Sequence, residues 1–489
     1  MIRTLILLGM MLVSLSGRPQ IVYADYSDPD VCEGSRGDYW LTASSFQCAP
    51  GLPILHSEDM QHWTLVNYAL KEVVPAERYA DVRHGCGVWA PCIRKHGDTY
   101  YIYWGDPDYG IFMVKTHDPA SEWDAPVLVV SGKGLIDPSP LWDDDGRIYL
   151  VNGWANSRCG FNSILTVRQL SADGTSAVSD PVMVYDGLTE GNHTIEGPKF
   201  YKKDGWYYIL APAGGVEQGY QLALRSRHVY GPYESKVIFN KSGIHQGGWA
   251  GGKFVCFQER QPYGRVLHLL DVKMQDGWPM MSVDRADKPM PLTCSSPSLA
   301  YQWHSNYSEA YGFSRQDGMR VYGHYTDSAS CNFWSVPNLY LKKFDKEVFT
   351  DTLLATITAN ADGQQSGFII MGRSYARLAF QLSDGHFLVK YITCADADKG
   401  NAEKEVLLSK VKARRFNAGA KDCYTCSVRF MLTCAKGASC TMAYSVNGAP
   451  YEAVPTTFQA REGKWIGAKY GVFSIAPYGK GRGWIDLKY

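Results

Sequence analysis

The chain has 489 residues, too many for one compact core, and this length predicts two large domains. Its 49 Lys and Arg residues balance its 49 Asp and Glu residues. The balance gives no overall field toward nucleic acid or an anionic membrane, and it favours an uncharged ligand.

Residues 1–24 have the pattern of a secretory signal peptide. The apolar run LILLGMMLVSL starts at Leu5, and the small-residue motif VYA ends at Ala24. The run is too short to span a bilayer. We therefore expect export to the periplasm or the exterior, with cleavage at Ala24 or after Ser16 and a mature chain that starts before Asp28. A retained anchor is the alternative.

A turn followed by an aromatic strand recurs along the first half of the chain. The four clear copies are GDYWLTASS at Gly37, GDTYYIYWG at Gly97, DGRIYLVNG at Asp145 and DGWYYILAP at Asp204. Gly-Asp and Asp-Gly pairs supply the positive φ of tight hairpins, so each copy is predicted to be the second strand of a hairpin. A fifth copy follows at Trp249 in WAGGKFVCFQER.

The repeat spacing of 60, 48 and 59 residues is typical of a β-propeller, in which each unit holds several strands. We predict five blades within residues 25–298. The innermost strand of each blade should precede its turn, and five residues there are expected to converge at the channel. They are Asp28, Trp89, Asp137, Glu196 and His245.

Three of these five residues are carboxylates, and their convergence indicates a chemistry. Like charges held together and partly desolvated push their pKa values apart, so one carboxyl can stay protonated while another is an ionised base. Hydrolysis of a glycosidic bond needs such a pair. The alternative is that the Asp-Pro and Glu-Gly-Pro segments are ordinary turns.

The segments YSDPDVCEGSRGDYWLTASSF, GVWAPCIRKHGDTYYIYWG, GLIDPSPLWDDDGRIYLV, IEGPKFYKKDGWYYIL and YGRVLHLLDVKMQDGWP together resemble glycoside hydrolase family 43. This resemblance implies an inverting β-xylosidase or α-L-arabinofuranosidase. It implies that Asp28 is the general base and Glu196 the general acid. Asp137 would then raise the pKa of the acid and orient it.

The resemblance also suggests residues that bind the sugar. Phe46 and Trp89 would stack on a sugar face, although core packing is an equal alternative for Phe46. Arg265 would hydrogen-bond sugar hydroxyls. Cys48 stands where many relatives have a tryptophan, so the leaving-group side of the pocket is expected to differ.

The resemblance places a central histidine at His245, which in several relatives lies beside a metal ion in the channel. No cofactor is required by the predicted chemistry. A structural calcium is left open, because one histidine does not define a calcium site without several oxygen ligands.

Beyond residue 298 the sequence character changes to short alternating strands with Gly and Asp-Gly turns, which predict an antiparallel β-sandwich over residues 299–489. The resemblance implies a concanavalin-like accessory domain. It also implies a loop that closes the pocket with an aromatic residue, for which Trp465 is the nearest match. A closed pocket admits only a chain end.

The second half also contains CYTC from Cys423 to Cys426, with Cys434 and Cys440 beyond it. These residues fit a zinc site or strand positions, and the absence of a nearby histidine favours strands. The thirteen cysteines allow at most six disulfides, whose connectivity the spacing does not reveal.

We therefore predict an all-β protein, a five-bladed β-propeller followed by a concanavalin-like sandwich. It would be an exo-acting inverting hydrolase that releases terminal β-D-xylose or α-L-arabinofuranose from xylan, arabinoxylan or arabinan. Its partners would be plant cell-wall chain ends, with no nucleic acid and no membrane span; the oligomeric state stays open. The alternatives are a retaining fructan hydrolase, an endo-arabinanase and a non-catalytic carbohydrate-binding propeller.

Overall fold

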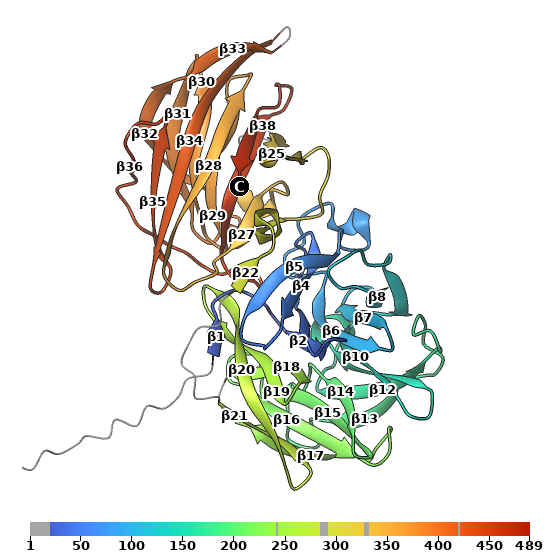
Figure 1. Ribbon diagram of the computed structural model, residues 1–489. Coiled ribbons are helices and arrows are strands. Elements are labelled where there is room, and N and C mark those ends of the chain that lie inside the picture. Colours follow the sequence, from blue (N-terminus) through green and yellow to red (C-terminus); the bar gives the residue numbers. More distant parts are fainter. Residues whose placement is uncertain (1–19, 241–242, 284–291, 327–331, 419–420) are drawn as a thin grey trace, which may run out of the picture.

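The computed structural model describes residues 20–240, 243–283, 292–326, 332–418 and 421–489. They form two bodies built from strands, a propeller and a sandwich, which confirms the predicted fold class (Figure 1). Most of the predicted signal peptide, residues 1–19, lies outside the described residues. Within the described ranges, no helix is long and apolar enough to cross a membrane.

Each blade is an antiparallel sheet whose four main strands follow chain order from the channel outward. Blade one contains β2 (Asp30–Glu33), β3 (Tyr39–Thr42), β4 (Gly51–Ser57) and β5 (Trp63–Leu70), and blade two contains β6 (Trp89–His96), β7 (Thr99–Asp106), β8 (Gly110–Thr116) and β9 (Val127–Ser131). Blade three contains β10 (Leu135–Trp142), β11 (Ile148–Trp154), β12 (Ile164–Leu170) and β13 (Val182–Asp186). Blade four contains β14 (Lys199–Lys203), β15 (Trp206–Ala213), β16 (Tyr220–Ser226) and β17 (Glu234–Phe239), and blade five contains β18 (Ile244–Ala250), β19 (Lys253–Arg260), β20 (Gly264–Gln275) and β21 (Trp278–Val283).

The repeated aromatic segments are the second strands β3, β7, β11, β15 and β19, as predicted. Each pairs with the innermost strand of its own blade through a short turn. Their apolar side chains are largely buried between neighbouring blades. The turn chemistry and the alternation therefore located every blade.

Two further strands tie the ends of this segment to the ring. β1 (Gln20–Val22) pairs with β20 of blade five, and β22 (Leu292–Cys294) pairs in parallel with β5 of blade one. The hydroxyls of Thr64 and Thr293 hydrogen-bond at 2.9 Å although 229 residues separate them. Blades one and five are thus each extended by a strand from the opposite end of the segment.

The innermost strands share a backbone feature that the sequence analysis missed. One residue per blade near the channel has a left-handed conformation: Asp28 (φ 51°), Ala90 (φ 36°), Asp137 (φ 56°), Gly197 (φ 57°) and Gln246 (φ 54°). β6, β10 and β18 each shift register there. Trp89, Glu196 and His245 each precede the left-handed residue of their blade; Trp89 and Glu196 still line the pocket, and His245 does not.

The second body is a sandwich of two sheets. One sheet has the strand order β23 (Tyr301–Trp303), β27 (Tyr340–Lys343), β38 (Lys469–Pro477), β29 (Gln365–Met371), β30 (Tyr375–Ser383), β31 (His386–Cys394) and β32 (Lys404–Lys412), with β26 (His324–Thr326) beside β38. The other has the order β24 (Gly312–Arg315), β25 (Gly318–Tyr322), β39 (Trp484–Lys488), β28 (Phe349–Ala359), β34 (Lys421–Ala435), β35 (Ser439–Val446) and β36 (Glu452–Ala453), with β33 (Arg414–Ala418) on β34 and β37 (Phe458–Gln459) on β35. The helical turns are α1 (Asn156–Cys159), η1 (Ala76–Tyr79), η2 (Pro297–Ala300), η3 (Phe333–Ser335) and η4 (Ala397–Lys399).

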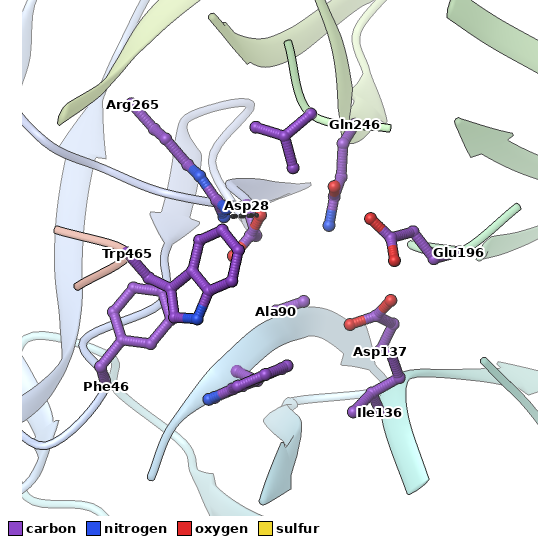
Figure 2. Close-up of a pocket in the computed structure, with 11 residues that line it drawn as sticks. Asp28, Phe46, Ala90, Ile136, Asp137, Glu196, Gln246, Arg265 and Trp465 are labelled. Atoms are coloured by element: carbon purple, nitrogen blue, oxygen red, sulfur yellow. Dashed lines mark hydrogen bonds and ion pairs between the residues drawn. The ribbon is translucent and has the colours of Figure 1, made fainter. Parts of the chain in front are cut away.

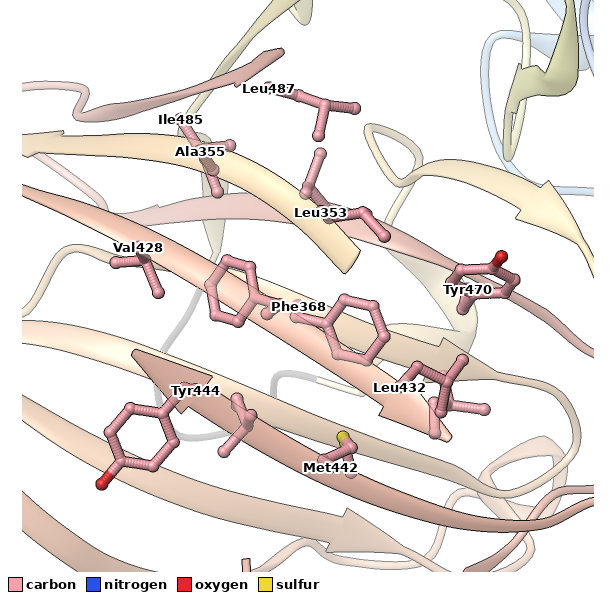
Figure 3. Close-up of a cluster of buried hydrophobic side chains, with 14 of the residues drawn as sticks. Leu353, Ala355, Phe368, Val428, Leu432, Met442, Tyr444, Tyr470, Ile485 and Leu487 are labelled. Carbon is pink, nitrogen blue, oxygen red and sulfur yellow. The ribbon is translucent and has the colours of Figure 1, made fainter. Parts of the chain in front are cut away.

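The facing sides of the two sheets form the largest apolar core of the protein. Phe368 stacks on Phe430 across this core with ring centroids 5.7 Å apart (Figure 3). Cys426, Cys434 and Cys440 are buried in the same core. These cysteines are therefore strand residues, and no group of three or more His, Cys, Asp or Glu that could hold a metal occurs among the described residues.

Candidate active site

A pocket of about 500 Å³ opens at the end of the propeller channel that faces the sandwich. It is lined by Asp28, Phe46, Trp89, Ala90, Ile136, Asp137, Glu196, Val216, Gln246, Arg265 and Trp465 (Figure 2). Seven of the eight residues predicted for the site are in this lining, and His245 is not. Gln246 lines the pocket in its place.

Both carboxylate oxygens of Asp28 are held by donors. Arg265 Nη1 donates to Oδ1 at 2.8 Å, and Ser44 Oγ donates to Oδ2 at 2.7 Å. Ser44 in turn accepts the backbone N–H of Ala90 at 2.7 Å. Asp28 is only 5% exposed, so this cation and hydroxyl are what stabilise its charge in the site. Sequence analysis did not single out Ser44, because its role depends on a contact between blades.

Asp137 lies deeper, on the neighbouring side of the channel. Burial raises the pKa of Asp137, and the negative charge of Asp28 raises it further. Three groups act in the opposite direction: the N–H of Gly197, which donates to Asp137 Oδ2 at 2.7 Å, and the charges of Lys199 and Arg265. Only glycine fits well at position 197, because φ is positive there and a Cβ would lie 3.0 Å from the Gln246 side chain.

Glu196 lies beside Asp137, and the two carboxyl groups point toward each other (Figure 2). Burial raises the pKa of Glu196 well above its usual range, and the charges of Asp137 and Asp28 add to the effect while Arg265 opposes it. Within the described part of the chain, no group donates a hydrogen bond to the Glu196 carboxyl; its backbone N–H donates to Pro212 O at 3.2 Å. The carboxyl pair therefore holds a proton near neutral pH, and Glu196 binds this proton more tightly than Asp137 does.

Aromatic side chains form the wall opposite these acids. Phe46 and Trp89 pack edge to face with centroids 6.4 Å apart, and Trp89 Nε1 donates to Gly85 O at 3.0 Å. Phe46 is 2% exposed and also packs against Ile466 of the sandwich. Phe46 both lines the pocket and belongs to a small core, and its stacking on a sugar stays a prediction.

The sandwich supplies the last wall through a loop that carries Trp465. The loop is tied to the propeller, since Gly467 N–H donates to Asp25 Oδ2 at 3.1 Å and Ala468 N–H donates to Pro262 O at 2.8 Å. Trp465 is 41% exposed, and its ring lies 5.4 Å from the guanidinium of Arg265. The pocket is therefore completed only when both domains are present.

Cys48 does not line this pocket. Its side chain is buried between the domains, where Lys469 Nζ donates to Cys48 Sγ at 3.1 Å. Cys48 packs with Phe46 and Ile466 in a small buried cluster and adds no surface to the pocket. The expectation that the leaving-group side of the pocket differs from that of relatives with a tryptophan here stays a prediction.

His245 is turned away from the pocket. Its Nε2 donates to Val216 O at 3.0 Å, and burial lowers the pKa of the ring so that it is neutral. The left-handed backbone at Gln246 directs that amide side chain into the pocket instead (Figure 2). Gln246 is 4% exposed, and its backbone N–H donates to Gln221 Oε1 at 2.9 Å.

The residues around His245 do not fit a calcium ion. Calcium takes about six to eight oxygen ligands. His245 Nδ1 is a buried atom without a partner, and it offers a single nitrogen. The positive charge of Arg265 also lowers the pKa of His245. This charge would disfavour a metal cation beside His245.

Comparison with known proteins places this geometry in a family. Residues 18–279 match the family model described as Glycosyl hydrolases family 43. Residues 295–489 match a second model, the β-xylosidase C-terminal concanavalin A-like domain.

Individual relatives agree with both matches. The chain is 32% identical over 318 residues to a non-reducing end α-L-arabinofuranosidase of Bacteroides ovatus, covering 57% of each chain. It is 25% identical to a β-xylosidase of Formosa agariphila, covering 93% of this chain and 86% of that protein. The chain spans about half the length of several curated relatives that it matches. A solved xylan β-1,4-xylosidase from Bacillus halodurans, 19% identical, has the same fold with a TM-score of 0.75 over 96% of this chain and 99% of that one.

Proposed function

Because this chain belongs to glycosyl hydrolase family 43, we propose that its pocket hydrolyses a glycosidic bond with inversion of the anomeric carbon. Asp28 is the general base, Glu196 the general acid, and Asp137 the third carboxylate. The observation that carries this assignment is the difference between the acids. Asp28 forms an ion pair with Arg265, whereas the Glu196 carboxyl accepts no hydrogen bond from the described residues and has a raised pKa.

In the reaction, Asp28 accepts a proton from a water molecule as that water attacks the anomeric carbon. The bond from this carbon to the leaving oxygen breaks, and Glu196 gives its proton to that oxygen. Arg265 and Ser44 hold Asp28 in one orientation throughout. After product release, the protons exchange with solvent so that Glu196 is protonated and Asp28 ionised again.

The shape of the pocket supports an exo-acting enzyme. The pocket is lined by the exposed Trp465 of the sandwich and by the buried Asp137 of the propeller, so we propose that a chain end enters past Trp465. We propose terminal β-D-xylose or α-L-arabinofuranose as the sugar released, from plant cell-wall xylan, arabinoxylan or arabinan. The names of the relatives from Formosa agariphila and Bacteroides ovatus support these two sugars.

Two alternatives fit the pocket less well. An endo-arabinanase needs an open groove, and here Trp465 of the sandwich lines the pocket together with the propeller residues. A non-catalytic carbohydrate-binding protein gains nothing from two buried carboxyls, Asp137 and Glu196, whose pKa values are raised. We further propose that no metal is required.

Export remains part of the proposal, and the fold bears on where the signal ends. β1 (Gln20–Val22) is a strand of blade five, and Val22 is 2% exposed. Cleavage after Ser16 would keep this strand, whereas cleavage after Ala24 would remove it. We therefore favour the earlier position, and N-terminal sequencing of the exported protein distinguishes the two.

The test measures release of 4-nitrophenol from the β-D-xylopyranoside and the α-L-arabinofuranoside by wild type, Asp28→Ala and Glu196→Ala. The wild type should cleave at least one substrate, and each variant should lose about a hundredfold or more in kcat/KM while remaining folded. Proton NMR of the first sugar formed should show the inverted anomer. Undiminished cleavage by both variants would refute the site.

A further inference from the structure

A buried lysine lies directly beneath the pocket. Lys199 is the first residue of β14 in blade four, and it is 1% exposed. Its Nζ donates to Pro91 O at 2.9 Å on β6 of blade two, so the side chain crosses the channel. Pro91 follows Ala90, a residue of the pocket lining. The ammonium therefore sits under the pocket floor and away from water.

This ammonium has no carboxylate of its own. Asp30, on β2 of blade one, is paired with Arg94 Nη1 at 2.6 Å and also accepts the N–H of Ile93 at 2.8 Å. Lys199 forms no ion pair with any carboxylate of the described residues. A buried unpaired cation is costly unless a nearby negative charge offsets it. Asp137 is the carboxyl on which the Lys199 charge acts.

We propose that Lys199 is a positioning residue of the hydrolytic site: its buried ammonium keeps the negative charge of the carboxyl pair on Asp137, so that the proton stays on Glu196. This inference rests on the proposed function, because it explains which of two carboxyls with raised pKa values is the general acid. Lys199 does not touch the sugar. It acts on the reaction through Asp137.

The other charged groups near Asp137 and Glu196 shift the pKa values of both carboxyls in the same direction. Asp28 raises the pKa of both carboxyls, and Arg265 lowers both. Lys199 lowers the pKa of Asp137 and is not among the causes that act on Glu196.

The remaining titratable groups near the channel add no charge. Burial raises the pKa of Cys92 on β6 to about 12, so this thiol is neutral. Burial lowers the pKa of His245 on β18, so the ring is neutral. Asp30 and Arg94 cancel each other as an ion pair. Lys199 and the Gly197 N–H are therefore the groups that lower the pKa of Asp137 without acting on Glu196.

The test uses Lys199→Met, with Lys203→Met as the control, because Lys203 is exposed on the same strand. Kinetics are compared on a glycoside with a 2,4-dinitrophenyl leaving group, which needs no protonation, and on the matching disaccharide, which does. We expect Lys199→Met to lose about tenfold or more in kcat on the disaccharide and little on the activated glycoside. The acidic limb of kcat/KM should move up by about one pH unit, since Asp137 then takes a proton more readily. Lys199→Arg, which keeps the positive charge, should have the acidic limb of kcat/KM at the same pH as wild type.

Equal losses on both substrates with an unmoved acidic limb would show that Lys199 is merely structural, and would overturn the proposal. A second measurement does not depend on turnover. The infrared C=O band of protonated carboxyls, titrated in wild type and Lys199→Met, should gain intensity in the variant at mildly acidic pH. An unchanged band overturns the role of Lys199. Failure of wild type to cleave any glycoside, with a changed band, overturns only the proposed hydrolysis.

Discussion

Glu196→Gln should disable the enzyme and, at alkaline pH, stabilise it. The pKa of Glu196 is raised from 4.5 to about 8 in the folded state. A folded-state pKa above the unfolded value means that the folded protein binds this proton more tightly. The resulting stability is fully present below the unfolded pKa and is lost as pH rises through the folded pKa. Glutamine has no charge at any pH, so the variant avoids that loss.

The size of the effect follows from the shift. The difference from 4.5 to about 8 corresponds to roughly 5 kcal/mol at most, at about 1.4 kcal/mol per pH unit. Glu196 is only half-buried and shares its proton with Asp137, which reduces the figure to about 2 kcal/mol. For a domain the size of the propeller, this free energy raises the unfolding temperature by roughly 4–8 °C.

Circular dichroism would follow thermal unfolding of wild type and Glu196→Gln at about pH 5 and about pH 9. The variant should unfold at a higher temperature than wild type near pH 9 and at a similar temperature near pH 5. Exposed Glu190, changed to Gln, is the control and should unfold as wild type at both. A difference that is absent near pH 9, or equal at both pH values, would refute the reasoning.

Three further predictions concern the pocket. Trp465→Ala should raise KM about tenfold with a smaller change in kcat, because about 1–2 kcal/mol of aromatic contact is lost; steady-state kinetics on the xyloside and arabinofuranoside check this. Ser44→Ala leaves Asp28 Oδ2 without its donor and should lower kcat about tenfold to a hundredfold, whereas unchanged kcat would show that Arg265 alone orients the base. Gln246→Ala should raise KM, which steady-state kinetics measure. EDTA should leave the activity of wild type within about twofold, and loss of activity in EDTA would contradict the poor fit of calcium.

The sequence was a good guide to the blades because the signals there are local. Gly-Asp and Asp-Gly turns next to alternating aromatic residues, as at Asp145 and Asp204, determine a hairpin without help from distant segments. The carboxylates at positions 28, 137 and 196 could also be located, since each stands near a turn at the start of a blade. Their convergence followed from the propeller geometry.

The errors arose where distant segments decide the structure. A left-handed residue within or just before the innermost strand of each blade redirects the side chains, and in blade five Gln246 and not His245 lines the pocket. Ser44 and Lys199 act through contacts between blades, and no local pattern marks them. Trp465 was found only through the family resemblance. The domain boundary at residue 298 stays a prediction, since η2 (Pro297–Ala300) spans it.

The pairing of β1 and β22 with the propeller determines when the ring can close during folding. β5 of blade one receives its neighbour β22 only after residue 294 has been synthesised, and β20 needs the earliest described residues, those of β1. Closing loops of this length is entropically costly and slow. The propeller ring of a nascent chain therefore cannot close until β22 has been synthesised. If the chain is exported as proposed, late closure leaves it unfolded while it passes through a membrane channel, and the ring closes afterwards.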